Sequence, residues 1–118
     1  MSESFKILPD NNAARKPSGL IPKACFTTDD KSEFTTSFFS APDGSVAAGL
    51  WEGAPCKMEI KSYPVNEKMT IISGQLVLTH SNGTEEVFGP GEVVFVTKGA
   101  AFTWHVTEYM RKYFMTAI

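Results

Sequence analysis

Glu67 is the residue of this chain with the clearest potential for chemistry. Met69 and Ile71 follow it at every second position, so the three side chains share one face of an expected strand. A carboxylate on an otherwise apolar face is costly to bury unless it is paired or protonated. Lys61 is the simplest cationic partner, and Tyr63 can donate a hydrogen bond from its hydroxyl group. We therefore expect Glu67 to pair with Lys61 and Tyr63.

The segment that carries Lys61 and Tyr63 leaves their direction open. Residues 57–63 alternate between polar and apolar side chains. Simple binary patterning would bury Met58 and Ile60 and expose the charged set. Both faces can be covered if the outer one packs under an N-terminal arm or a partner subunit.

Two roles are compatible with a buried Glu67. The carboxylate can form an internal ion pair that only holds strands together, or it can anchor a ligand, because perturbed carboxylates often mark functional sites. No nucleophile motif accompanies it, so the sequence indicates no particular reaction and does not decide whether the protein is an enzyme. Cys25 and Cys56 lack a CxxC spacing and are expected to be reduced, apolar residues.

The elements that must position these residues are short strands. The 118 residues suit one compact domain, and the aromatic content of 12% favours a β core. Turn signals at Pro42-Asp43-Gly44 and Ser81-Asn82-Gly83 separate the segments, and Asn-Gly is typical of a type I′ hairpin turn. This spacing predicts an antiparallel, all-β sandwich or barrel. The expected strands cover residues 34–39, 46–52, 57–63, 69–72, 75–79, 85–88, 92–96, 102–106 and 109–118.

The N-terminal residues do not show this pattern of short strands and turns. Pro9, Pro17 and Pro22 interrupt any long element, while Ile21 and Phe26 suggest some buried contacts. We expect residues 1–28 to form an arm and residues 29–118 to form the single barrel domain.

Charge and hydropathy exclude several partners. The net charge is −2 and the basic residues are scattered, so a nucleic-acid footprint is not expected. No apolar run is long enough to span a bilayer. The first residues lack the charged-then-apolar order of a secretory signal, so we expect a cytoplasmic protein.

Two glycine-bracketed motifs give the chain a family resemblance. The first runs from Asn66-Glu67 to Ser73-Gly74, and the second runs from Gly89-Pro90-Gly91 to Lys98-Gly99. With Ala48-Gly49-Leu50-Trp51-Glu52 and Thr103-Trp104, they resemble the cupin superfamily over residues 45–118. The most similar branch contains small cupin domains of ureidoglycine aminohydrolase and ethanolamine-utilisation proteins. This resemblance implies a cupin-type antiparallel barrel, also called a jelly roll or double-stranded β-helix.

The resemblance also implies where a metal would bind and which ligands are missing. Metal-dependent cupins carry three histidines and one glutamate, and the corresponding positions are Lys61, Tyr63, Glu67 and Phe102. An ammonium group has no lone pair to offer and a phenyl ring has no donor atom, whereas divalent metals need imidazole, carboxylate or thiolate ligands. His80 and His105 are placed elsewhere. We therefore expect no metal and no other cofactor.

The same resemblance places Lys61 and Tyr63 inside the barrel beside Glu67, with Phe102 and Trp104 as walls of a cavity. The first functional hypothesis is a metal-free cupin that binds a small polar or anionic metabolite there. The alternatives are a metal-dependent aminohydrolase acting on ureido compounds and a non-enzymatic oligomerisation or regulatory module. Cupins of this size resemble proteins that pair as dimers, so we expect a homodimer. The expected ligand-binding residues are Glu59, Lys61, Tyr63, Glu67, Phe102 and Trp104.

Overall fold

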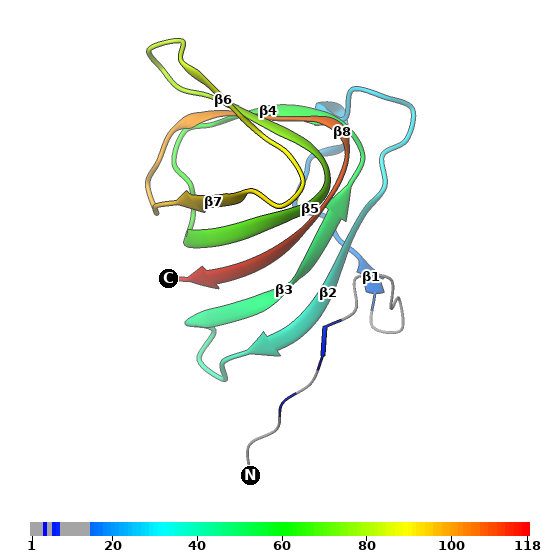
Figure 1. Cartoon of the computed structure of the whole chain (residues 1–118), viewed down its shortest axis with the longest axis vertical. Helices are drawn as coiled ribbons and strands as arrows, with labels where there is room; N and C mark the ends of the chain where they lie inside the picture. Colours follow the sequence, from blue (N-terminus) through cyan, green and yellow to red (C-terminus); the bar gives the residue numbers. More distant parts are fainter. Residues whose placement is uncertain (1–3, 5, 8–14) are drawn as a thin grey trace.

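The protein is a rolled, all-β structure, as the strand and turn pattern predicted (Figure 1). The computed structural model describes residue 4, residues 6–7 and residues 15–118. Its one 3-10 helix in this part of the chain is η1 (Lys23–Cys25). The strands are β1 (Arg15–Pro17), β2 (Glu33–Ser40), β3 (Val46–Gly53), β4 (Cys56–Ile60), β5 (Asn66–Thr79), β6 (Glu85–Phe88), β7 (Val93–Val96) and β8 (Phe102–Ala117).

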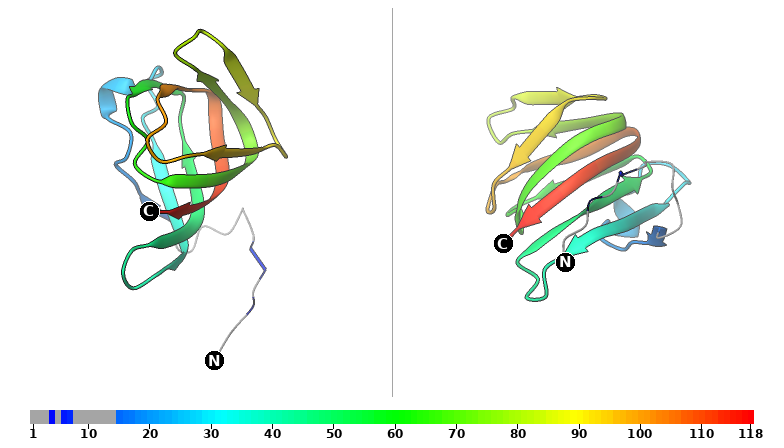
Figure 2. Two further views of the ribbon diagram at one scale, coloured as in Figure 1. Left: turned by 90° about the vertical axis from the view of Figure 1, so that its left-hand side faces the viewer. Right: turned by 60° about the horizontal axis from the view of Figure 1, so that its bottom comes forward.

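The long strands β5 and β8 form the centre of the barrel. They pair antiparallel from Asn66↔Ala117 to Thr79↔Thr103, and Figure 2 shows them side by side along their curved course. The first part of β8 also pairs with β4, and its last part pairs with β3. On the other side, β5 pairs with β7 along its first part and with β6 along its last part. Each central strand therefore pairs with one outer neighbour along its first part and with another along its last part.

The structure joins segments that the sequence pattern had separated. Residues 69–72 and 75–79 were expected as two strands but form one strand, β5, and residues 102–106 and 109–118 likewise form β8. The reason is that β5 passes through register shifts between Ile71 and Leu76 without leaving the sheet. A bulge bends a strand and increases its twist, so the chain turns the corner of the barrel with its pairing retained.

The hairpin between β5 and β6 is confirmed, but its turn type differs from the prediction. Gly83 has a φ of +86°, whereas no described residue other than glycine has a positive φ. Asn82 therefore lacks the left-handed conformation of a type I′ turn. The Gly83 N–H donates to the His80 carbonyl at 2.9 Å, and the Asn82 side chain accepts from the Thr84 N–H at 2.9 Å. This pattern matches a type I turn followed by a left-handed glycine.

Residues 15–28 of the predicted arm pack against the barrel. Strand β1 pairs with β2, and Ile21 and Phe26 are buried. Most of the remainder, residues 1–3, 5 and 8–14, lies outside the described residues, including Pro9. In the described part of the chain, no helix is both long and apolar enough to cross a membrane.

Gly74 sits at the bend of β5 and has no room for a side chain. Its φ is +86°, a conformation that costs other L-residues free energy. A Cβ atom there would collide with the backbone carbonyl of Tyr109 and lie 2.7 Å from the Cα of Met110. The bend therefore requires glycine for two independent reasons.

We predict that Gly74→Ala lowers the free energy of unfolding by about 2–5 kcal/mol, because it adds a backbone clash to the conformational cost. Gly83→Ala is the matched control. Gly83 has the same φ, but a Cβ there meets no atom within 4 Å, so we expect a loss of about 1–2 kcal/mol. Urea denaturation of both variants measures the difference, and equal losses would contradict the steric role of Gly74.

Candidate functional site

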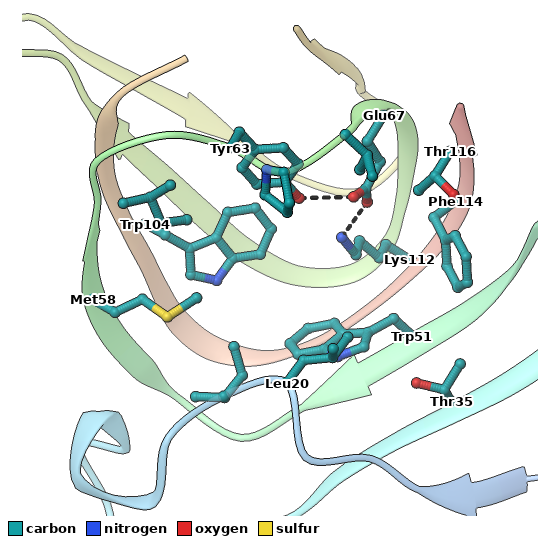
Figure 3. A pocket seen from close by; sticks show the side chains of 14 residues that line it. Leu20, Thr35, Trp51, Met58, Tyr63, Glu67, Trp104, Lys112, Phe114 and Thr116 are labelled. Carbon is teal, nitrogen blue, oxygen red and sulfur yellow. Dashed lines mark hydrogen bonds and ion pairs between the residues drawn. The ribbon is translucent and has the colours of Figure 1, made fainter. Parts of the chain in front are cut away.

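The barrel holds a cavity of about 480 Å³ that is open to solvent on one side. Figure 3 shows aromatic and aliphatic side chains around most of its wall, with a polar group at one end. The apolar wall includes Ile21, Trp51, Met58, Ile60, Trp104 and Phe114. The polar lining residues are Thr35, Tyr63, Glu67, Lys112 and Thr116.

The polar end of the cavity is a buried carboxylate with two strong donors. The Tyr63 hydroxyl donates to Glu67 Oε1 at 2.7 Å, and the Lys112 ammonium donates to Glu67 Oε2 at 2.6 Å (Figure 3). Glu67 and Lys112 are only 6% and 5% exposed, so this ion pair is shielded from water. Burial, together with the Glu67 carboxylate, raises the pKa of Tyr63 above its usual value. Tyr63 is therefore a neutral hydrogen-bond donor at neutral pH.

The pairing register explains why Lys112 reaches this carboxylate. On β8, Lys112 lies opposite Ile71 of β5 and Trp51 of β3. Strand alternation places its side chain on the same face as the buried Met110. At the polar end of the cavity, β5 therefore provides the carboxylate and β8 provides the cation.

Two indole rings flank the ammonium group of Lys112. Its Nζ lies 5.4 Å from the ring centroid of Trp51 and 4.9 Å from that of Trp104, within the range of a cation–π interaction. The two rings themselves meet edge to face, with centroids 6.4 Å apart. Gly53 gives Trp51 its space, because a Cβ at position 53 would lie 2.6 Å from the Cη2 atom of the indole.

A second buried carboxylate, Glu33, fixes the rim of the cavity. It accepts hydrogen bonds from the Ser18 hydroxyl at 2.9 Å and from the backbone N–H groups of Leu20 and Ile21 at 3.2 and 2.9 Å. The indole N–H of Trp51 donates to the same carboxylate at 2.9 Å. Glu33 therefore joins the segment of residues 18–21 to the aromatic wall, and Leu20 and Ile21 become part of the cavity lining.

Two residues of the cavity wall each have a buried polar atom that lacks a regular partner. The indole nitrogen of Trp104 and the hydroxyl oxygen of Thr35 are buried without a hydrogen bond among the described residues. Trp104 does interact with the Cys56 thiol, a weak acceptor. Burial raises the pKa of Cys56 from 9.0 to about 11, and contacts with the Val106 backbone and the Trp104 side chain only partly oppose this rise. Both atoms are shielded from the cavity, so they add no hydrogen-bonding group for a ligand there.

The structure gathers half of the predicted ligand-binding residues in the cavity. Tyr63, Glu67 and Trp104 line it, as expected. Phe102 does not line this cavity but packs behind it, with its ring centroid 5.6 Å from that of Tyr63. Its position therefore supports the Tyr63 ring rather than the cavity wall.

The predicted pairing of Lys61 with Glu67 is wrong, and Glu59, which was expected to bind a ligand, does not line the main cavity. Lys61 and Glu59 are exposed and border a separate hollow of about 320 Å³ near His80. The physical reason is the alternation along β4, which turns Met58 and Ile60 toward the main cavity and Glu59 away from it, and Lys61 lies just beyond the end of this strand. A partner from the neighbouring strand β8 has replaced the one that is near in sequence.

Lys112 and Trp51 are the site residues that sequence reasoning missed. For Lys112 a signal exists: Met110, Lys112 and Phe114 recur at every second position in an apolar segment. A lysine in a core-facing series needs a buried counter-charge. Only the register of β8 against β5 identifies Glu67 as that counter-charge.

The residues of the cavity do not fit a divalent metal ion. Within residues 4, 6–7 and 15–118, no three His, Cys, Asp or Glu side chains are grouped to hold one. The single carboxylate of the cavity is already bound by an ammonium group and a phenol. A metal ion would therefore meet one occupied oxygen ligand and a neighbouring positive charge, instead of the three or four ligands that such ions require.

Comparison with known proteins identifies related domains. The family described as EutQ-like cupin domain matches residues 40–114. A protein of unknown function from Pseudomonas syringae, which belongs to the DUF861 family, has a TM-score of 0.78 and 25% identity over 89% of this chain. This chain spans only 45% of that protein's length.

Two further solved structures are similar in fold. The EutQ protein of Clostridium difficile has a TM-score of 0.62 and 20% identity, covering 74% of this chain and 68% of its own. The Cnp3 cupin domain of Schizosaccharomyces pombe has a TM-score of 0.59 and 22% identity, covering 77% and 69%. No functionally curated protein matches the chain.

We predict that Lys112→Met lowers the free energy of unfolding by about 3–5 kcal/mol, because it leaves the Glu67 carboxylate buried without its cation. The double variant Glu67→Gln/Lys112→Met removes both charges and should be more stable than the single variant. Lys61→Met is the control, and we expect a change within about 0.5 kcal/mol, because Lys61 is exposed. Urea denaturation measures all three, and similar effects of Lys112→Met and Lys61→Met would disprove the importance of the buried pair.

Proposed function

Since the chain belongs to the family of EutQ-like cupin domains, we propose that its barrel binds a small polar or anionic metabolite without a metal ion. Family membership supplies the scaffold, but a fold alone does not define an activity. The proposal therefore depends on the chemistry of the cavity between Trp51, Trp104 and Lys112.

The observation that carries the proposal is the cavity itself. Its volume of about 480 Å³ lies in the range of small-molecule sites, roughly 300–1,000 Å³. Apolar walls combined with a few convergent polar groups are also typical of such sites. A barrel that served only as a scaffold would gain stability by filling this space with side chains.

The polar end has the groups to orient a ligand. The Lys112 ammonium has three N–H donors. One is used by Glu67, and the Met69 sulfur, at 3.5 Å, is a weak second acceptor. Donor capacity therefore remains for an oxygen atom of a ligand. No nucleophile motif accompanies these groups, so we propose binding and assign no reaction.

We also propose that the protein is a homodimer. A row of residues crosses the outer face of the sheet, in the order Phe39, Ala48, Met115, Lys68 and Phe95, since each is the register partner of the next. Phe39, Met115 and Phe95 are 54%, 54% and 65% exposed. Exposed apolar patches of this kind often mark contact surfaces, and a second copy of the chain presents the same row.

Tryptophan fluorescence tests ligand binding directly, because Trp51 and Trp104 are the only two tryptophans in the sequence and both line the cavity. A metabolite thermal-shift screen on metal-stripped protein should find compounds that stabilise the fold, and their titration should change tryptophan emission. We predict that Tyr63→Phe and Lys112→Met weaken binding by about tenfold or more, whereas Lys61→Met leaves it unchanged.

Two results would count against this function. Hits that bind Lys112→Met as tightly as the native chain would show that the polar end is not the binding site. Elemental analysis that finds stoichiometric manganese, zinc or iron in protein as purified would favour the metal-dependent alternative.

For the homodimer, we predict that size-exclusion chromatography with light scattering gives the mass of two chains. Phe95→Lys and Met115→Lys should shift this mass to one chain, because each places a second positive charge beside Lys68 in the contact. Val87→Lys provides the control, since Val87 is also exposed but lies on β6, outside the row. A monomeric native chain would overturn the proposal.

A further inference from the structure

The polar end of the cavity has the composition of an ammonium-binding site. One carboxylate, Glu67, and two indole rings, Trp51 and Trp104, surround a single position. A carboxylate with aromatic faces is the combination that recognises organic cations. In this protein the position is taken by the Nζ atom of Lys112, which reaches it from β8.

The charges that line the cavity are already balanced. Glu67 and Lys112 contribute one negative and one positive charge and lie 2.6 Å apart. Glu33 does not add a free charge to the cavity, because its carboxylate accepts hydrogen bonds from Ser18, Leu20, Ile21 and Trp51 behind the wall. A charged ligand would therefore bring an unpaired charge against the apolar walls of the cavity, which is unfavourable.

The hydrogen-bonding group that remains available at this end of the cavity is a donor. Lys112 has donor capacity beyond its bond to Glu67. The indole N–H of Trp104 does not add to it, because its nitrogen is shielded from the cavity and contacts the Cys56 thiol. In Figure 3 the Lys112 ammonium lies beside the Trp104 ring at the polar end of the cavity. A ligand oxygen that accepts a hydrogen bond would complement Lys112.

We infer that Lys112 fills the cation site of this cavity from within, and that the ligand is therefore an uncharged molecule with a carbonyl oxygen. The oxygen accepts a hydrogen bond from Lys112, and the apolar body of the ligand packs against Met58, Ile60 and Trp51. Amides, ketones, esters and lactones belong to this class, whereas amines and carboxylates do not. This inference rests on the proposed function, because it specifies the ligand of the same cavity.

A matched set of probes tests the class of ligand. Benzamide, benzoate and benzylammonium have nearly the same size and shape but carry neutral, negative and positive polar groups. Titrated against the native protein and followed by tryptophan emission, benzamide should bind at least about tenfold more tightly than either ion. Tighter binding of benzoate would overturn the neutral-ligand inference and leave an anion as the ligand. Tighter binding of benzylammonium would show that Lys112 does not occupy the cation site.

The ligand specificity of Lys112→Met tests separately whether the Lys112 ammonium fills the cation site. Methionine keeps an unbranched chain but removes the charge, so Glu67 and the two indoles should accept an external ammonium ion. We expect benzylammonium to raise the melting temperature of Lys112→Met and to leave that of the native protein and of Lys61→Met unchanged. The double variant Glu67→Gln/Lys112→Met, which lacks both charges, should fold and should lose this response.

The outcomes separate this inference from the proposed function. If the metabolite screen yields ligands and all of them are anions or amines, the cavity binds metabolites but the inference about their class is wrong. If Lys112→Met responds equally to benzylammonium and benzamide, Lys112 does not fill a cation site. If neither the screen nor the three probes at millimolar concentration change tryptophan emission, the proposed function itself fails.

Discussion

The buried carboxylate of Glu67 imposes the requirement on which the interior depends. An ionised carboxylate in an apolar barrel needs a cation and hydrogen-bond donors to remain stable. Pairing of β5 with β8 supplies the cation, since the register brings Lys112 within 2.6 Å of the carboxylate. The indoles of Trp51 and Trp104 pack around the same ammonium group. Fold and site are thus two consequences of one register.

The sequence predicted the scaffold well because its signals are local. Turn residues and strand alternation act over a few positions, so most strands and the hairpin at Ser81-Asn82-Gly83 were predictable. Glu67 was expected in the interior because it lies on an apolar strand face, and the family resemblance placed Tyr63 and Trp104 in the cavity, which all three residues line. The bend at Gly74 was not predictable in full, because its clash partner Tyr109 comes from a distant segment.

The partner of Glu67 could not be identified from nearby sequence positions. Lys61 is six positions away in sequence, and Lys112 is 45 positions away. Proximity favoured Lys61, whereas the alternation of residues 57–63 favoured its exposure, and the alternation was the better guide. Identifying Lys112 requires the register of two long strands with bulges. A shift of one residue in that register would turn every side chain to the other face.

An ammonium group at this position changes what the barrel can do. A metal ion offers open coordination positions and can activate a bound water molecule, whereas the Lys112 ammonium offers N–H donors held in place by a carboxylate. Such a group can orient and polarise a carbonyl oxygen through a hydrogen bond, but it does not produce a hydroxide nucleophile. Since Tyr63 holds the other oxygen of the same carboxylate, the three side chains form a closed, charge-neutral unit. Their geometry therefore supports the proposed selection of a neutral ligand by its oxygen atom and its apolar shape.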